Sequence, residues 1–327
     1  MNLRLPWLMV VLLGLTALLA VTGLCVGSTG WEWAFGQHTE AAARTVLWEI
    51  RAPRTLASFL VGCLLGLSGA VAQGLFRNPL AEPYLLGTSS GAALFIALAL
   101  ATGSLGDASA WWASWGLTGV AFVGALAGVW ATLVLARGAT QTIRLLLCGV
   151  VVSVVSGAVT QLLMVRSAET WRTMQAFMLG NTGLLSWSSC LVLALTLVVA
   201  LPVGILLSRV LDALSLGEDV ARSLGVSLGA ARATLVTVLA LACGAAVAQA
   251  GLVAFVGLVA PHLVRPWSLS RHRSLLLLSS WVGGLLLLAG DVMARWLLAP
   301  QELPVGVLTA VLGGAYLLLQ LYQQERQ

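Results

Sequence analysis

Lysine is absent from this chain of 327 residues, and all seventeen basic residues are arginines. Phosphate-loop ATPases, protein kinases and Schiff-base enzymes each depend on a lysine side chain. The absence therefore excludes binding and hydrolysis of ATP by the usual phosphate-loop chemistry within this chain.

Charge of either sign is also scarce. Charged residues make up 9% of the chain, against about 25% in soluble domains, whereas hydrophobic residues make up 59%. The mean hydropathy is +0.98, and apolar runs fill the whole length. Length alone would suggest two domains, but this pattern predicts an all-α, polytopic integral membrane protein with a single domain over 1–327.

Groupings of residues that perform enzyme chemistry are missing as well. The cysteines contain no CxxC pair, the three histidines do not cluster, and no HExxH or paired-carboxylate pattern stands out. Cysteines scattered through apolar runs are typical of packing residues. We expect no catalytic residue, no metal site and no cofactor in this chain.

The N-terminus combines Arg4 with an apolar run over 5–26. That run exceeds the 7–15 residues or so of a signal-peptide core, and no A-x-A site follows. Leu24, before Cys25, is too large for a lipoprotein cleavage site. We interpret the run as a retained first membrane helix.

Runs of about 20 apolar residues can cross a bilayer. Clear ones lie near 7–27, 55–76, 114–136, 145–165, 187–207, 274–297 and 304–322. A shorter, glycine-rich run covers 84–102. The stretch 233–264 would be about 48 Å long as one helix, and Gly251, Gly257 and Pro261 offer breaks. Splitting it into a full and a short helix gives ten spans.

Ten spans place both termini on one side, and the arginines indicate which. With a cytoplasmic N-terminus, eleven of the seventeen lie inside and six outside, as the positive-inside rule requires. The outer six are Arg44, Arg51, Arg54, Arg166, Arg172 and Arg295.

The tetrapeptide AVAQ occurs at 70–73 and again at 246–249. Each copy ends a full helix and precedes a short one, and the two helices run in opposite directions, as in an inverted repeat. In so biased a chain the match could also arise by chance. Gln73, Gln161 and Gln249 are the notable uncharged polar residues of the spans, and we expect them to form helix-packing hydrogen bonds.

The longest polar interruption on the inner side is the loop 208–229. Two short helical turns fit it, broken at Gly217 and ending at Gly225. A solvated loop is the simplest interpretation, but apolar residues recur in it. An exposed amphipathic turn of this kind favours a docking site for a protein partner.

Arginines on the outer side oppose the orientation bias and need a reason. Arg51, Arg54 and Arg295 could anchor helix ends by snorkelling, or they could dock an acidic partner. Physics alone favours snorkelling. Asp291 and Arg295 are one helical turn apart and can pair. No chain of intramembrane carboxylates is visible, which argues against a proton-driven transporter.

Four sequence blocks resemble one family. Segments 50–93 (IRAPRTLASFLVGCLLGLSGAVAQGLFRNPLAEPYLLGTSSGAA), 214–226 (LSLGEDVARSLGV), 251–265 (GLVAFVGLVAPHLVR) and 291–314 look like the permease subunits of type II ABC importers. Members of this family take up iron–siderophore complexes, haem and cobalamin. The resemblance runs from about residue 45 to the C-terminus.

The resemblance implies ten spanning helices, with helices 2–5 and 7–10 as inverted repeats. It also implies a homodimer in a bacterial inner membrane with both termini cytoplasmic. Two cytoplasmic ATPase subunits would hold ATP and magnesium, and a periplasmic binding protein would deliver the chelate. Lipid is the remaining expected partner, and no nucleic acid is expected.

Family roles carry over to matching positions. Arg51, Arg54 and Arg295 match binding-protein contacts, which reverses the preference for snorkelling. A cytoplasmic gate matches 138–144, including Thr140, Gln141 and Thr142. The ATPase coupling positions are Leu214, Leu216, Gly217, Glu218, Asp219, Arg222, Leu224 and Gly225.

Three classes of function remain distinguishable. The leading prediction is the permease of an ATP-driven chelate importer; the alternative is a secondary transporter driven by an ion gradient. A membrane enzyme or scaffold is a third, weakened by the missing catalytic clusters. Among substrates, iron–siderophore comes first, followed by haem and cobalamin.

Overall fold

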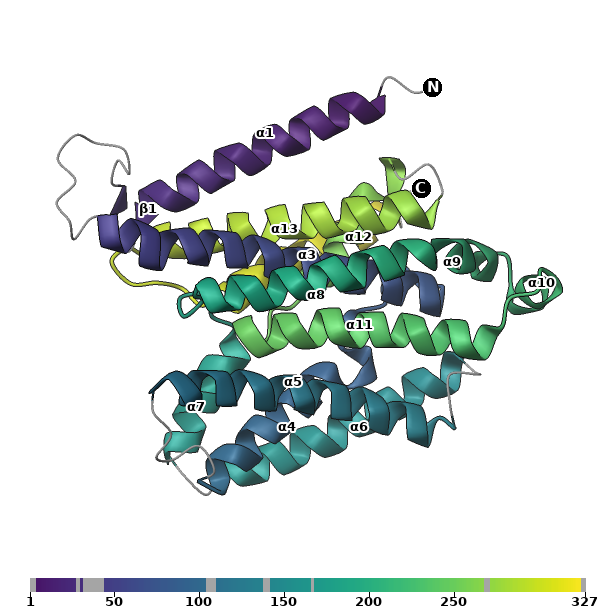
Figure 1. Ribbon diagram of the computed structural model, residues 1–327, viewed down its shortest axis with the longest axis horizontal. Helices are drawn as coiled ribbons and strands as arrows, with labels where there is room; N and C mark the ends of the chain where they lie inside the picture. Colours follow the sequence, from purple (N-terminus) through teal and green to yellow (C-terminus); the bar gives the residue numbers. More distant parts are fainter. Residues whose placement is uncertain are drawn as a thin grey trace.

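The computed structural model describes residues 4–27, 30–31, 44–103, 110–137, 142–165, 168–267 and 271–324, and it is all-α (Figure 1). Seven helices, among them the continuous helix Val46–Phe76, are long and apolar enough to span a membrane, and three shorter helices lie at the other predicted spans. The ten are α1 Arg4–Cys25, α3 Ala52–Phe76, α4 Thr88–Ala101, α5 Ala110–Leu135, α6 Thr142–Met164, α8 Trp187–Leu206, α11 Leu228–Ala250, α12 Val256–Val264, α13 His272–Trp296 and α14 Val305–Gln324.

Short elements connect these helices. Helices α9 and α10 lie on the side predicted to be cytoplasmic, called the inner side, and α7 lies on the opposite, outer side. The others are a π-helical turn that leads into α3, two 3-10 turns, and a two-stranded antiparallel ribbon after α1. Their bounds are η1 Val46–Arg51, η2 Pro83–Leu86, α7 Ala168–Leu179, α9 Ser208–Ser215, α10 Glu218–Ser223, η3 Arg265–Trp267, β1 Val26–Gly27 and β2 Gly30–Trp31. Figure 1 shows that α1 begins and α14 ends at the same end of the bundle as α9 and α10.

The centre of the molecule is the contact between α3 and α13. Their backbones approach closely because Gly62 and Gly66 face Gly283, and a Cβ at Gly66 would collide with the carbonyl of Ser279. Small residues are what allow such an approach inside a membrane, where van der Waals packing rather than the hydrophobic effect holds helices together. Helix α1 lies at the edge, against α13 and α3.

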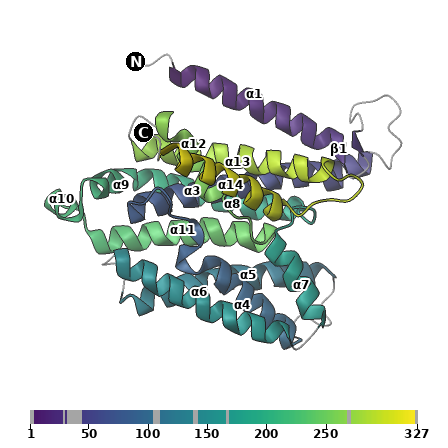
Figure 2. The ribbon, with the colours of Figure 1, turned by 180° about the vertical axis from the view of Figure 1, so that it is seen from behind.

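Helix contacts follow the expected repeat. Helix α3 packs on α13, and its counterpart α11 packs on α5; α4 contacts α5 and α6, as α12 contacts α13 and α14. Exchanging helices 2–5 for 7–10 therefore maps each contact onto another. Figure 2 shows α14 on the face opposite α5 and α6, lying across α12 and α13.

The stretch 233–264 breaks at Gly251, where φ is 70° and ψ is −155°. Gly257 and Pro261, the other proposed breaks, lie inside α12, so those two predictions are wrong. Proline has no backbone N–H group, so the carbonyl four residues earlier loses the hydrogen bond that it would accept in a helix. Here that carbonyl belongs to Gly257, and it points at Gly69 of α3, where there is no room for a Cβ.

The loop 77–87 returns into the protein and meets the start of α12. Pro83 lies against Gly257, which also touches Leu65. Leu65 is eleven residues before the end of α3, or about 16 Å at 1.5 Å per residue. The neighbouring Glu82 accepts a hydrogen bond from the Phe255 amide (3.3 Å), so this carboxyl group lies at membrane depth.

Replacing Gly66 with alanine should lower the stability of the protein, since the new methyl group forces α3 away from α13. Overpacking of this kind costs about 1–3 kcal/mol. Gly14 of α1 is a matched control because a Cβ there would meet no atom within 4 Å. Thermal unfolding in detergent should show a lower midpoint for Gly66→Ala and no loss for Gly14→Ala; equal midpoints would contradict the close packing.

Candidate functional site

The inner loop divides into a buried face and an exposed face. Leu211, Leu214 and Ala221 are buried against the helix bundle, whereas Leu216 and Leu224 are 67% and 64% exposed. Gly217 and Gly225 have φ values of 116° and 80°, which allow the chain to turn at both ends of α10. The two short helices and both breaks match the prediction, but Leu214 lies on the anchored side.

Glu218 points toward the bundle. Its carboxylate accepts a hydrogen bond from Arg232 Nη2 of α11 (2.6 Å) and lies 3.6 Å from Arg77 Nη2 and 3.7 Å from Arg222 Nη2. Arg232 is 2% exposed, and Arg77 caps the end of α3. Glu218 therefore joins α10 to the inner ends of two spanning helices.

Electrostatics favour the ionised form of Glu218. Partial burial alone would raise the pKa, but the hydrogen bond and charge of Arg232, with the charges of Arg77 and Arg222, outweigh burial and hold the pKa below its ordinary value. The resulting stabilisation is present above the unfolded-state pKa and is lost as pH falls through the folded one. The link is therefore intact at neutral pH.

Asp212 ties α9 to α13. Its Oδ1 accepts a hydrogen bond from the backbone amide of His272 (2.9 Å) and lies 2.7 Å from His272 Nδ1. Asp219, in contrast, is exposed and contacts only Arg222 Nη1 (2.9 Å) within the described residues. Among the predicted gate residues, Thr140 and Gln141 lie outside the described residues, and Thr142 begins α6.

At the outer end, Asp291 of α13 organises a buried polar cluster. Its carboxylate accepts from Arg54 Nε (3.0 Å) and from the Thr182 hydroxyl (2.6 Å), and it pairs with Arg295. Arg54 reaches on to Glu302 (2.8 Å), in the loop before α14. The paired side chains of Arg54, Asp291 and Arg295 are 7% exposed or less.

Arg295 and Arg51 extend this cluster to α1. Arg295 Nη1 donates to the carbonyl of Gly23 (2.8 Å), and Arg51 Nη1 donates to the carbonyl of Leu24 (3.4 Å). The expected Asp291–Arg295 pair is confirmed. The snorkelling interpretation is wrong for Arg54 and Arg295, because buried guanidinium groups with internal partners do not reach headgroups. Docking of a binding protein by the three arginines stays a prediction.

Two polar residues at membrane depth escaped the sequence reasoning. Glu82 caps the start of α12, and the Tyr84 hydroxyl donates to the carbonyl of Val253 (2.8 Å). Both lie in the loop 77–87, whose prolines and glycines are typical of an ordinary inner loop. Of the glutamines, Gln73 forms the expected packing bonds, to the carbonyl of Leu258 (3.1 Å) and from Arg265 (2.9 Å).

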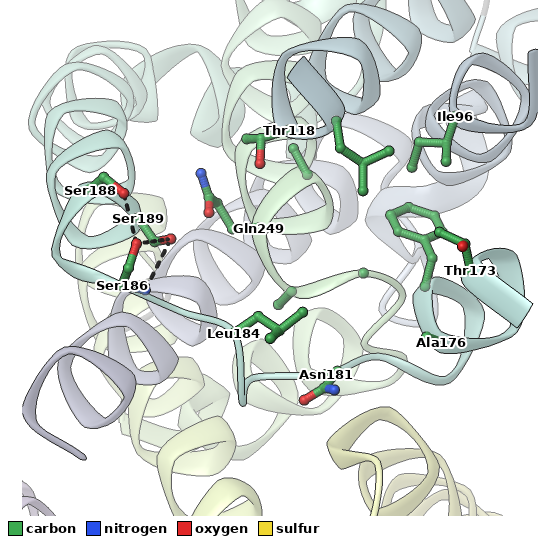
Figure 3. A pocket seen from close by; sticks show the side chains of 15 residues that line it. Ile96, Thr118, Thr173, Ala176, Asn181, Leu184, Ser186, Ser188, Ser189 and Gln249 are labelled. Atoms are coloured by element: carbon green, nitrogen blue, oxygen red, sulfur yellow. Dashed lines mark hydrogen bonds between the residues drawn. The ribbon is translucent and has the colours of Figure 1, made fainter. Parts of the chain in front are cut away.

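A cavity of about 270 Å³ lies at the outer end between α4, α5, α7, α8 and α11 (Figure 3). Gln249 lines this cavity. Its side chain does not form the expected packing hydrogen bond with any described residue. The lining of the cavity is uncharged. Within the described residues, no three His, Cys, Asp or Glu side chains gather as a metal site.

Comparisons with known proteins agree with this architecture. Residues 8–323 match the model of the FecCD transport family. The hemin transport system permease HmuU of Yersinia pestis is 38% identical, over 97% of this chain and 95% of that protein. The vitamin B12 import system permease BtuC of Klebsiella pneumoniae is 41% identical, over 92% and 90%. A metal-chelate type ABC transporter solved in an inward-facing conformation superposes with a TM-score of 0.87 at 28% identity, over 97% and 99% of the two chains.

Removing the charge of Asp291 should destabilise the fold, because Arg54 and Arg295 would remain buried without a counter-charge. Breaking a buried ion pair from one side costs about 3–5 kcal/mol. Asp291→Asn keeps the size of the side chain, and Asp219→Asn is the matched control at an exposed ion pair. Thermal unfolding in detergent should separate the two variants clearly. A Tm for Asp291→Asn equal to that of the control would show that the cluster is not needed for stability.

Proposed function

The chain belongs to the FecCD transport family as a permease of the metal-chelate, haem and vitamin B12 type of ABC importer, and we propose that it imports a bulky metal chelate by using ATP hydrolysed on separate subunits. Two copies of the chain would enclose the path in a bacterial inner membrane, with both termini cytoplasmic. We infer transport from periplasm to cytoplasm because the vitamin B12 relatives are named as permeases of an import system.

The observation that carries the proposal is the two-sided loop 208–229. Its outward face offers Leu216, Val220 and Leu224 to a partner, whereas its inward face is joined through Glu218 to α3 and α11. Exposed apolar side chains on a polar loop suit a protein partner. The ion pairs of Glu218 connect this loop to the spanning helices, so a movement of the partner can reach them. A chain without lysine needs such a partner for ATP hydrolysis.

The cargo is proposed by class only. The two relatives carry hemin and vitamin B12 in their names, and the iron–siderophore class belongs to the same proposal. All three are bulky, metal-containing chelates. No ATP, magnesium or other cofactor is proposed to bind this chain itself.

At the outer end, we assign the arginines an indirect part in binding-protein docking. Arg54 holds Glu302 and therefore positions the loop between α13 and α14, which faces outward; Arg295 holds the end of α1. The affinity of the binding protein for permease in lipid discs, compared between Arg54→Lys and the exposed Arg172→Lys, tests this role. A lysine cannot bridge both carboxylates, so only the former should weaken binding.

Substitutions on the two faces of the loop 208–229 should have different effects. Leu216→Asp with Leu224→Asp should abolish ATPase binding, since charge replaces the apolar contact. Glu218→Gln should retain ATPase binding but reduce transport, because the neutral amide weakens the link to Arg232. Leu184→Asp, exposed on the outer side, controls for the substitution itself. Co-purification and uptake assays measure the two effects, and loss of ATPase binding in Glu218→Gln would contradict the division.

Reconstitution distinguishes the proposal from an ion-driven transporter. Purified permease should hydrolyse no ATP, and vesicles should accumulate chelate only with the ATPase subunits and ATP. Uptake that follows an imposed proton or sodium gradient without ATPase subunits would establish the alternative. The measurement is radiolabelled or coloured chelate retained by vesicles, with an ionophore as the control for gradients.

A further inference from the structure

The repeated AVAQ tetrapeptide ends α3 and α11, but its two glutamines have different surroundings. Gln73 is 3% exposed and forms hydrogen bonds to both Leu258 and Arg265. Gln249, at the equivalent place of the second repeat, forms no side-chain hydrogen bond with any described residue and lines the outer cavity. Figure 3 shows it on the cavity wall near Thr118 and the serines that begin α8. The cavity therefore contains the amide of Gln249, which has no hydrogen-bond partner among the described residues, whereas the equivalent amide of Gln73 is hydrogen-bonded within the protein.

The lining defines the chemistry of an occupant. Hydroxyl and amide groups come from Thr118, Thr173, Ser188 and Gln249, and apolar walls come from residues such as Phe177 and Leu184. The lining contains no ionisable side chain, so it offers no ion pair to a charged ligand. At about 270 Å³, it lies below the roughly 300–1,000 Å³ of pockets that enclose a whole ligand. It suits the polar, uncharged part of an amphiphile.

The position of the cavity is at the membrane surface. Trp187 begins α8 and donates to the carbonyl of Trp48 (3.0 Å), with ring centroids 5.2 Å apart. Both side chains are partly exposed, at 37% and 61%. Tryptophans of this kind mark the level of the lipid headgroups. Ester carbonyls of phospholipids lie at and just below this level.

Apolar side chains continue from the cavity along α8. Helix α11 lies between α5 and α8, in contact with both (Figure 1), but its residues 242–247, next to the cavity, are buried. Ser188 of α8 lines the cavity, and Leu191 and Leu195 follow it on the same face of that helix, each 59% exposed. An acyl chain can lie against these exposed leucines.

We infer that this cavity is a binding site for an outer-leaflet phospholipid. The Gln249 amide donates to an ester carbonyl of the glycerol region, the hydroxyls of Thr118 and Ser188 supply further hydrogen bonds, and one acyl chain lies along α8 against Leu191 and Leu195. The lipid bridges α5, α7, α8 and α11. Because no charged side chain lines the cavity, zwitterionic and anionic phospholipids bind equally well. The inference does not depend on the transported substrate.

The test is retention of phospholipid by detergent-purified permease, measured by native mass spectrometry after delipidation. Wild type should keep a phospholipid that Gln249→Leu binds up to roughly tenfold more weakly, since the hydrogen bond from the Gln249 amide is lost. Ala248→Phe should exclude it by filling the cavity. Gln161→Leu, exposed on α6, is the matched control and should retain it. Circular dichroism confirms that each variant is folded.

Back-titration with phosphatidylethanolamine and phosphatidylglycerol gives the second measurement. Equal affinities for wild type, with weaker binding of both to Gln249→Leu, support the site. Retention that is unchanged in both Gln249→Leu and Ala248→Phe would overturn it. A strict preference for the anionic lipid, or occupancy by detergent alone after lipid is supplied, would overturn it as well.

Discussion

A buried carboxylate at one end of the bundle and a partly buried one at the other set the geometry on which the rest of this structure depends. Asp291 gathers Arg54, Arg295 and Thr182 at the outer end, and Glu218 gathers Arg77, Arg222 and Arg232 at the inner end. Charges removed from water are costly unless they are paired, so each carboxylate fixes the helices that supply its partners. Arginine suits this task because its planar fork can bridge two acceptors at once, as Arg54 does between Asp291 and Glu302.

The two clusters differ in what they hold. The outer one joins spanning helices α3 and α13 to connecting segments and to α1, so it closes that end of the bundle. The inner one joins the exposed helix α10 to the ends of α3 and α11, so it transmits position from a loop to the membrane core. Between them, the glycine contact of α3 with α13 keeps the centre rigid. In the proposed function, a partner that moved α10 would therefore act on helices that are closely packed against one another.

Apolar run length was enough to predict the seven clear runs, each of which is helical in the structure, because a membrane leaves few choices for an apolar run. Glycine predicted the turns at Gly217 and Gly225, but it offered Gly251 only as one of three breaks in the stretch 233–264, of which Gly251 alone was correct. Sequence could not reveal that Pro261 stays within α12, since this depends on where the Gly257 carbonyl finds space beside Gly69. Nor could it reveal the burial of Arg54 and Arg295, because their partners lie as far as 272 residues away in the chain. Glu82 was missed for the same reason, because the return of its loop to membrane depth depends on tertiary contacts.

The repeat itself shows why matching sequence does not fix matching chemistry. Gln73 and Gln249 end equivalent helices within the same tetrapeptide, but the short helix that follows each takes a different course. After α11 the chain passes directly into α12, whose Leu258 carbonyl, together with Arg265 beyond its end, then satisfies Gln73 of the other repeat. After α3 the longer loop 77–87 intervenes before α4, and no described residue of α4 hydrogen-bonds the amide of Gln249, which lines the cavity instead. The loops that follow the two helices differ in length, so the same tetrapeptide lies in two different surroundings.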